Sequence, residues 1–299
     1  MGSPKNTRLS AGYTHGVIFE VSADNYTIRG ISVGGVYTSL LVPEIRSMFD
    51  VGASPRSFSG ARRLFLSHGH VDHIGALAGF LGIRALIGKK NPLKVFLPKE
   101  IEGPLTEALS TLARLQQYPL EFDTIPMRPG DTASLGSNLY VRAIRTYHPV
   151  PSLGYIFFRR VDKLLPEFSR LSGTEIGQRR KAGEKLFRQQ ETNELAYVTD
   201  TLAKVLDAQP QLYSTKVLII ECTFLDKKKS LQATHQGCHI HLDELIERAE
   251  RFKNNAIVLM HFSQLYRPVD VHRILAERCP ENLKNRVIPF APSSGHWPG

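Results

Sequence analysis

Three histidines and one aspartate stand at His68, His70, Asp72 and His73, directly after the apolar run at residues 64–66. Imidazole nitrogens and carboxylate oxygens are the ligands that Zn²⁺ and related divalent ions take in catalytic sites, where one position stays open for water. A solvated histidine-rich turn would explain one or two of these histidines, but not this order of residues after a buried strand. The segment is therefore interpreted as a metal-binding motif.

The spacing within this motif suits two metal ions. If the chain stays extended as far as His70, the side chains of His68 and His70 project to the same side and can bind one ion. A turn after His70 directs Asp72 and His73 toward a second ion. Paired metals, typically about 3.5–4 Å apart, activate a water and stabilise both the attacking and the leaving oxygen of a displacement. One short motif cannot fill two coordination spheres, so further ligands are expected elsewhere.

Four later strand ends carry candidate ligands or acids. Sheets of α/β proteins build their sites at the carboxyl ends of strands, so we expect these side chains to converge on the motif. A proline directly after His148 bars a helix there and favours an extended turn. The four pairs are the strand 139–145 with His148, the strand 194–198 with Asp200, the strand 216–220 with Glu221, and the strand 256–260 with His261.

The remaining segments predict an alternation of strands and helices around these strand ends. Helices are expected at residues 74–87, 99–117 and 241–252, and the second keeps Leu105, Leu109, Leu112 and Leu115 at helical spacing. No internal repeat or low-complexity linker divides the chain, which favours one domain over residues 1–299. The strands expected before and within the motif are residues 15–21, 26–33, 37–42, 49–52 and 63–67, and a strand is also expected at 94–97 and at 286–288.

Composition narrows the setting and the partners. The 299 residues carry 38 Lys and Arg against 28 Asp and Glu, a net charge of +10 that favours a polyanionic partner such as nucleic acid. Cys222, Cys238 and Cys279 form no CxxC pair, so no structural disulfide is expected. No apolar stretch approaches the roughly 20 residues of a membrane span, and no signal peptide is recognised. We expect a cytoplasmic or other intracellular location, nuclear if the source is a eukaryote, and no membrane partner.

A basic segment at about residues 159–190 differs from the rest of the chain. It holds nine Lys and Arg with few apolar residues, and its densest part contains Arg179, Arg180, Lys181 and Lys185. On charge alone a solvated helix face is the ordinary interpretation. The alternative is a basic arm, inserted into the domain, that contacts phosphates.

The ordered motifs resemble those of metallo-β-lactamase-fold hydrolases, and more closely those of short-form tRNase Z, the endoribonuclease that removes 3′ trailers from precursor tRNA. The resemblance runs from Gly30 through to the last strands of the chain. It rests on the motif at residues 68–73 and on His148-x-Val150-Pro151-Ser152-x-Gly154-Tyr155, residues 196–201, Glu221-x-Thr223-Phe224-Leu225, residues 239–242 and residues 261–263.

This resemblance implies an α/β fold of the αββα type, with two mixed sheets flanked by helices, and two Zn²⁺ ions per chain, with Mn²⁺ or Fe²⁺ as other possibilities. It implies a homodimer acting on precursor tRNA, in which the basic segment binds the RNA. Asp72 is expected to orient or accept the proton of the attacking water, and Glu221 to orient His239 as proton donor to the leaving oxygen. The implied ligand sets are His68, His70 and His148 for one ion, Asp72, His73 and His261 for the other, and Asp200 between them.

Several positions depart from the family pattern, among them Gly69, which takes the place of a commoner polar or larger residue. Leu265 stands where the family usually has arginine, Cys238 replaces a glycine before His239, and Ala78 replaces a proline after the motif. None of these changes removes an expected ligand, although the loss at Leu265 concerns substrate handling. Two alternative functions stay open: a phosphodiesterase for small or cyclic substrates, which would not need a basic arm, and a catalytically weak RNA-binding protein that keeps its metal for structure.

Overall fold

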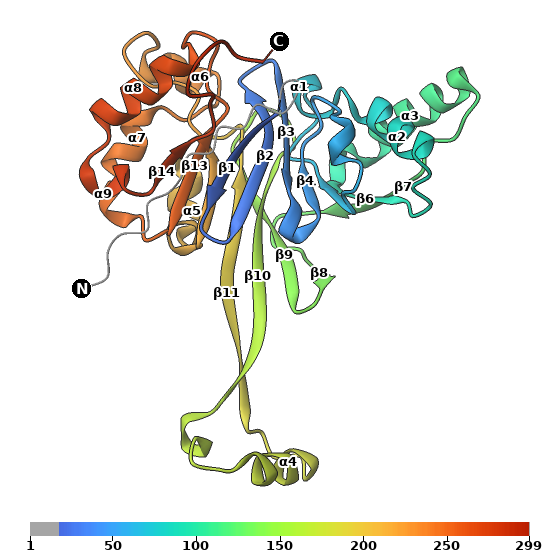
Figure 1. The fold of residues 1–299 in the computed structure, drawn as a ribbon, viewed down its shortest axis with the longest axis vertical. Helices are drawn as coiled ribbons and strands as arrows, with labels where there is room; N and C mark the ends of the chain where they lie inside the picture. Colours follow the sequence, from blue (N-terminus) through green and yellow to red (C-terminus); the bar gives the residue numbers. More distant parts are fainter. Residues whose placement is uncertain (1–17, 299) are drawn as a thin grey trace.

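The computed structural model describes residues 18–298, which form two seven-stranded β-sheets packed face to face (Figure 1). In the first sheet the strands follow chain order, antiparallel from β1 to β4 and parallel from β4 to β7. Its strands are β1 (Phe19–Ala23), β2 (Tyr26–Val33), β3 (Tyr37–Val42), β4 (Ser47–Phe49), β5 (Arg63–Phe65), β6 (Leu93–Pro98) and β7 (Phe122–Met127).

The second sheet has the order β14-β13-β12-β11-β10-β9-β8. The four strands from β14 to β11 are parallel, whereas β10, β9 and β8 continue the sheet in antiparallel pairing. Its strands are β8 (Thr132–Gly136), β9 (Leu139–Arg145), β10 (Leu153–Leu164), β11 (Phe187–Val198), β12 (Val217–Glu221), β13 (Ala256–Met260) and β14 (Val287–Pro289). Both sheets are therefore mixed.

Alternating side chains of the strands fill the space between the sheets. Phe65 of β5 points into this central core, while Leu64 and Leu66 on either side of it face the outer helices. Rings from both sheets meet in the core: Phe65 stacks on Phe96 with centroids 4.4 Å apart, and it meets Phe157 of the second sheet edge to face with centroids 4.9 Å apart. These contacts join the two sheets into one body.

Helices cover the outer face of each sheet, so the αββα prediction is confirmed (Figure 1). Side chains of α2 and α3 pack on the first sheet, and those of α5, α7 and α8 on the second. No helix described between residues 18 and 298 has the length and apolarity needed to cross a bilayer. The helices are α1 (Val71–Ile74), α2 (Leu77–Leu86), α3 (Glu102–Gln116), α4 (Gly173–Lys181), α5 (Lys204–Ala208), α6 (Leu231–Gln236), α7 (Leu242–Glu247), α8 (Pro268–Arg278) and α9 (Glu281–Lys284).

Strands β10 and β11 run far beyond the sandwich and carry α4 at their tip (Figure 1). They remain paired from Tyr155 opposite Tyr197 out to Leu164 opposite Phe187. The two ends of the basic segment, residues 159–164 and 187–190, therefore belong to a two-stranded ribbon, and its middle forms the tip with the nine-residue helix α4, which begins at a capping box of Ser172 with Glu175. We call residues 159–190 the arm.

Several sequence-based boundaries are wrong, for identifiable reasons. The strand expected at 15–21 falls partly outside the described residues, and β1 begins at Phe19. In place of the strand expected at 49–52, the chain forms β4 at Ser47–Phe49. This strand ends there because Asp50 adopts a left-handed conformation with φ of 52°. The expected helix 74–87 is divided into α1 and α2, and the helical part of 241–252 is α7 followed by a 3₁₀ turn. Strands β7 and β8 were not predicted.

The helix expected at 99–117 is confirmed as a 3₁₀ turn at Lys99–Ile101 followed by α3. Leu105 and Leu109 are buried on the first sheet, but Leu112 and Leu115 are 43% and 80% exposed. Only the first two of the four regularly spaced leucines therefore lie on the buried face of α3.

A buried arginine holds the loop that leads into the metal-binding motif. Arg84 of α2 is only 6% exposed, and burial lowers the pKa of its guanidinium. Its Nη1 donates to the carbonyl oxygens of Ser59 and Ala61, both at 2.7 Å, and its Nη2 donates to the carbonyl of Asn91 at 3.1 Å. The side chain thereby attaches the segment before β5 to the helix after it.

We expect Arg84→Met to lower the free energy of unfolding by about 2–4 kcal/mol, because three carbonyl oxygens in a buried region lose their charged donor. Denaturant unfolding followed by circular dichroism measures this change. The matched control is Arg62→Met at an exposed position, expected to change stability by less than about 0.5 kcal/mol. Equal stability of the two variants would contradict the structural role of Arg84.

Candidate active site

The seven predicted metal ligands lie together where strands of both sheets end. They form two groups, and in each group one ligand atom per residue lies within 4.8 Å of the others. The motif supplies members of both groups, because the chain is extended through His70 and then turns into the short helix α1. The first group is His68, His70, His148 and Asp200, and the second is Asp72, His73 and His261.

The first group is compact, and its three imidazole rings contribute two Nε2 atoms and one Nδ1 atom. The Nε2 atom of His68 lies 3.0 Å from Nδ1 of His70, and Nε2 of His148 lies 3.2 Å from the same Nδ1 atom. Oδ2 of Asp200 is 3.7 Å from Nε2 of His68 and 4.0 Å from Nε2 of His148. These four atoms face a common centre.

The second group faces the other oxygen of Asp200. Nε2 of His73 lies 3.4 Å from Oδ2 of Asp72 and 3.5 Å from Oδ1 of Asp200. Nε2 of His261 lies 3.2 Å from the same Oδ1 atom. Asp200 therefore presents one carboxylate oxygen to each group, the arrangement that a ligand shared by two ions requires.

Two buried nitrogens test whether a divalent metal fits. Among the described residues, Nε2 of His73 and Nε2 of His261 are buried and have no hydrogen-bond partner. Unpaired buried polar atoms are rare because they lose hydration without compensation. Both atoms point at carboxylate oxygens 3.2–3.5 Å away, so a metal ion is the species that would satisfy them together. The donor set of imidazole and carboxylate fits such an ion.

The electrostatics of the site also suit a cation. Burial lowers the pKa of His68 to about 2, so its ring is neutral, which is the form that binds metals. Burial acts the same way on His73, but the carboxylates of Asp200 and Asp50 outweigh it and raise the pKa of that ring well above its ordinary value. The pocket around His73 is thus negative enough to hold a proton, and the same field favours a metal ion in its place.

A buried carboxylate that the sequence analysis missed supports the motif from beneath. Asp50 accepts hydrogen bonds from the backbone N–H of Ser67 at 2.7 Å and from its hydroxyl at 2.8 Å. It also accepts from the hydroxyl of Tyr197 at 2.6 Å and from Nδ1 of His73 at 2.8 Å. The last bond fixes the tautomer of His73 so that Nε2 is free for a metal. The only signal in the sequence was an aspartate directly after an apolar run.

A second buried carboxylate, Glu221, organises the remaining catalytic candidates. It accepts from the backbone N–H groups of Thr201 and Ile240, from the hydroxyl of Thr223 at 2.5 Å, and from Nδ1 of His239 at 3.2 Å. Thr223 Oγ1 also lies 3.1 Å from Nδ1 of His261. A continuous chain of hydrogen bonds therefore joins the candidate ligand His261 to His239 through Thr223 and Glu221.

His239 has features of both an acid and a ligand. Burial lowers the pKa of its ring, but the Glu221 carboxylate prevails and raises it to about 9. A ring nitrogen of His239 also lies within 4.8 Å of ligand atoms of Asp200 and His261. Since a carboxylate partner is usual for metal-bound imidazoles as well as for catalytic ones, geometry alone permits both roles.

Several residues around the site adopt a conformation that L residues rarely take. Asp50, Asp200 and His261 have φ of 52°, 43° and 61°, so the chain turns sharply as it leaves β4, β11 and β13. Cys238 has φ of 57°, which explains why glycine is the expected residue there. Left-handed backbone costs about 1–2 kcal/mol per residue, and four of the nine described non-glycine residues that adopt it lie at the site.

Two glycines allow the backbone to approach the ligands closely. A Cβ atom on Gly52 would lie 1.9 Å from the carbonyl oxygen of Asp72, and one on Gly34 would lie 2.9 Å from that of His261. The N–H of Gly34 also donates to the carbonyl of Phe262 at 3.0 Å. Glycine is thus required at both positions for the first sheet to pack against the ligand-bearing turns.

The predicted RNA-binding residues are not brought to this site. Arg179, Arg180, Lys181 and Lys185 are exposed at the tip of the arm. Helix α1, which carries Asp72 and His73, lies toward the opposite end of the molecule from α4 (Figure 1). Any joint action of the two regions needs a long substrate or a second subunit.

The other positions singled out in the sequence have local partners. His235 bonds Glu244 at 2.9 Å, and His241 caps α7 through its side chain. Leu265 is 54% exposed, and Arg267 pairs with Asp270 at 2.9 Å, so it does not replace the missing arginine. His15 lies outside the described residues. All three cysteines are free thiols, with Cys222 and Cys279 buried.

Comparison with known proteins agrees with this geometry. A family model described as the beta-lactamase superfamily domain matches residues 42–262. The chain is 31% identical over 272 residues to a chloroplastic tRNase Z of Arabidopsis thaliana, covering 90% of this chain and 76% of that protein. A second tRNase Z of the same plant is 31% identical over 267 residues, covering 89% and 95%.

The crystal structure of human short-form tRNase Z covers 88% of this chain and 95% of its own, with a TM-score of 0.56 and 15% identity, a likeness of fold. The matched family region contains all seven side chains of the two ligand groups. The resemblance drawn from the sequence motifs is thereby confirmed, and this chain belongs to the tRNase Z family of the metallo-β-lactamase superfamily.

Proposed function

We propose that this protein is a zinc-dependent endoribonuclease that removes the 3′ trailer from precursor tRNA. The observation that carries the proposal is the pair of ligand groups that share Asp200, directly beside the Glu221 and His239 pair. Two metal ions bound there would activate a water molecule and neutralise the phosphate oxygens of the scissile bond. Such an enzyme acts where precursor tRNA is made, which supports an intracellular location.

The chain's own residues supply the proton transfers. Asp72, whose side chain is 18% exposed, orients the attacking water and accepts its proton. Nδ1 of His239 is held by Glu221, so Nε2 is the atom that donates a proton to the leaving 3′-oxygen. The products are a tRNA with a 3′-hydroxyl and a trailer with a 5′-phosphate.

The arm supplies recognition. Residues 159–190 hold nine Lys and Arg against four Asp and Glu, half of the net charge of the chain. Because A-form RNA hides its base edges, an enzyme for many tRNAs must bind backbone and shape with cationic side chains. We infer that the arm is an insertion in one domain that spans residues 1–299.

A homodimer is part of the proposal. The arm tip and α1 lie toward opposite ends of the molecule (Figure 1), which leaves the tip of one subunit free to bind a tRNA whose 3′ end enters the site of the other. Helix α4 buries none of its residues and stands away from the sandwich at the end of β10 and β11 (Figure 1).

The first test uses a 5′-labelled precursor tRNA with a 3′ trailer and the zinc-loaded protein. We expect one cut directly after the discriminator nucleotide, abolished by a chelator and lowered at least about 100-fold by Asp72→Ala, which removes a ligand and a proton acceptor. Electrophoresis of the labelled product measures the position of the cut. Hydrolysis of bis(p-nitrophenyl) phosphate without any cut in the tRNA would instead favour a phosphodiesterase for small substrates.

The zinc content of a His239 variant distinguishes a proton donor from a metal ligand. We expect His239→Ala to lower kcat about 100-fold or more, since general acids contribute about 10²–10⁴, while KM stays within about twofold and two zinc ions remain bound per chain. Steady-state kinetics and metal analysis by mass spectrometry measure these quantities. His296→Ala, at an exposed histidine, is the matched control.

Loss of one zinc ion per chain in His239→Ala would identify the ring as a ligand and reject the acid role. Unchanged turnover would reject both roles.

The arm is tested by replacing Arg179, Arg180 and Lys181 with alanine together, which keeps α4 intact because alanine favours helices. We expect KM for precursor tRNA to rise about tenfold or more, with a shallower dependence on salt, and hydrolysis of bis(p-nitrophenyl) phosphate to stay unchanged. The control replaces three exposed lysines of the sandwich, Lys89, Lys90 and Lys94.

Mixing the arm variant with His239→Ala subunits tests the dimer. If an arm serves the partner's site, mixed dimers combine one intact arm with one intact site and regain activity at low RNA concentration. A monomeric mass in solution, or no regain after subunit exchange, would contradict this arrangement.

A further inference from the structure

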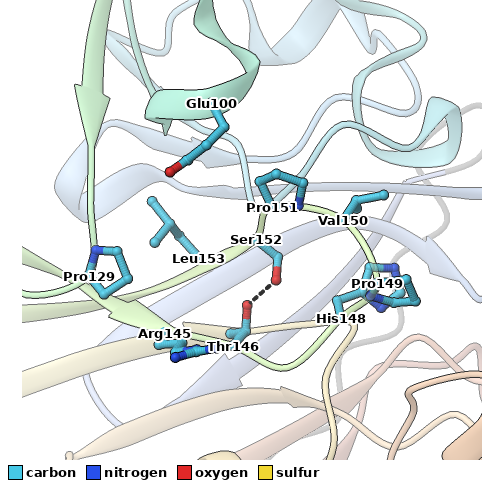
Figure 2. Close-up of a pocket in the computed structure, with 10 residues that line it drawn as sticks. All are labelled: Glu100, Pro129, Arg145, Thr146, His148, Pro149, Val150, Pro151, Ser152 and Leu153. Atoms are coloured by element: carbon cyan, nitrogen blue, oxygen red, sulfur yellow. Dashed lines mark hydrogen bonds between the residues drawn. The ribbon is translucent and has the colours of Figure 1, made fainter.

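A pocket of about 420 Å³ opens beside the candidate ligand His148 (Figure 2). Its size lies in the lower part of the range for small-molecule sites, roughly 300–1,000 Å³, which suits one nucleotide and excludes a base pair. The lining residues are Glu100, Pro129, Arg145, Thr146, His148, Pro149, Val150, Pro151, Ser152 and Leu153. No part of the proposed mechanism uses this pocket.

The walls of the pocket are held rigidly. The hydroxyl of Thr146 donates to that of Ser152 at 2.6 Å across the base of the loop, a bond drawn in Figure 2. The N–H of Leu153 donates to the carbonyl of Ser67 at 2.8 Å, which ties the loop to the metal-binding motif. Three prolines further restrict the lining. A pocket that is formed in advance loses little entropy when a ligand enters.

One carboxylate and one guanidinium lie at the rim of the pocket. Glu100 and Arg145 are exposed and form no ion pair with any residue of the described chain. Figure 2 shows Glu100 reaching over the pocket from one side, with Arg145 and Thr146 on the opposite side and His148 at its end. A carboxylate repels phosphate but accepts from base N–H groups, whereas a guanidinium binds phosphate. The rim thus suits a base at Glu100 and a phosphate at Arg145.

The position of the pocket decides which nucleotide it takes. His239 precedes α7, on the side of the site where α6 and α7 lie, whereas Glu100 directly precedes α3 on the other side (Figure 1). Under the proposed function His239 protonates the 3′-oxygen of the tRNA body, so the body ends on the α7 side. A nucleotide on the α3 side, in contact with His148, belongs to the trailer.

We propose that this pocket binds the first nucleotide of the 3′ trailer, with its base edge at Glu100 and the following phosphate at Arg145. The inference rests on the proposed function and adds a subsite to it. Every RNA base offers at least one N–H on its Watson–Crick edge, so the carboxylate can accept from any of them. The pocket therefore contributes affinity for an unpaired trailer nucleotide of any sequence.

The test compares two precursors of one tRNA, with trailers of equal length, that differ only in the first trailer nucleotide: an ordinary nucleotide or an abasic one. We expect the wild-type protein to cut the abasic precursor with a kcat/KM about tenfold lower. Glu100→Ala should reduce this ratio to about twofold or less, whereas Arg145→Ala, which removes a phosphate contact that both precursors make, should lower kcat/KM for both and keep the ratio near tenfold. The ratio is insensitive to the general effect of a lost charge on RNA binding, because both precursors share it.

Glu121→Ala and Arg128→Ala change exposed residues at the two ends of β7 that do not line the pocket, and they should keep the tenfold ratio. Calorimetric titration of the zinc-loaded protein with a 5′-phosphorylated trinucleotide gives a second measurement. Its abasic analogue should bind about tenfold more weakly to the wild-type protein and about equally to Glu100→Ala.

Equal cutting of both precursors by the wild-type protein would overturn the pocket proposal and leave the proposed function standing. No cutting of either precursor would overturn the proposed function, and the trinucleotide titration would then decide whether the pocket takes a nucleotide at all. Equal binding of the trinucleotide and its abasic analogue would overturn it independently.

Discussion

The carboxylate of Asp50 is the point through which the two sheets and the metal-binding motif are joined. It follows β4 of the first sheet, receives the hydroxyl of Tyr197 from β11 of the second, and holds both Ser67 and the ring of His73. An isolated buried carboxylate costs several kcal/mol, and here four donors compensate it. Removing any donor would leave part of that cost uncompensated. The packing of the sandwich and the orientation of the candidate ligand His73 thus depend on one group.

Glu221 is a second buried carboxylate that accepts hydrogen bonds from four donors, on the other side of the site. Its four donors come from Thr201 after β11, from Thr223 after β12, and from His239 and Ile240 before α7. Each carboxylate therefore gathers the ends of neighbouring elements and fixes the tautomer of one histidine. The left-handed turns at Asp50, Asp200 and His261 are the conformational cost of bringing so many groups to one edge. The hydrogen bonds and any bound metals offset it.

The candidate ligands, which the structure brings together, could be found in the sequence because their signals are local. A motif after an apolar run, or a histidine before a proline, needs only a few neighbouring residues, and strands β2, β3, β9 and β13 matched their predicted bounds. Asp50 and Tyr197 are 147 residues apart, and the residues next to each of them give no signal that predicts their hydrogen bond. The same holds for the pocket, where Glu100 and Pro129 reach the loop after His148 only through the fold. Motifs of neighbouring residues can be recognised in the sequence, whereas hydrogen bonds and pocket walls formed by distant residues cannot.

Strands β10 and β11 connect the arm to the candidate active site. β10 begins at Leu153, beside the pocket, and β11 ends at Val198, two residues before Asp200, while their far ends carry the arm. Where they leave the sandwich, Glu191 pairs with Arg142 and Arg160 at 2.8 and 2.9 Å, and both guanidinium groups stack on aromatic rings at 4.5 Å. Exposed ion pairs contribute little singly, but this network stiffens the base of a two-stranded ribbon. If the arm binds RNA as proposed, so fixed a base would hold the RNA at a defined distance from a site, and contacts far from the scissile bond would help to select where the chain is cut.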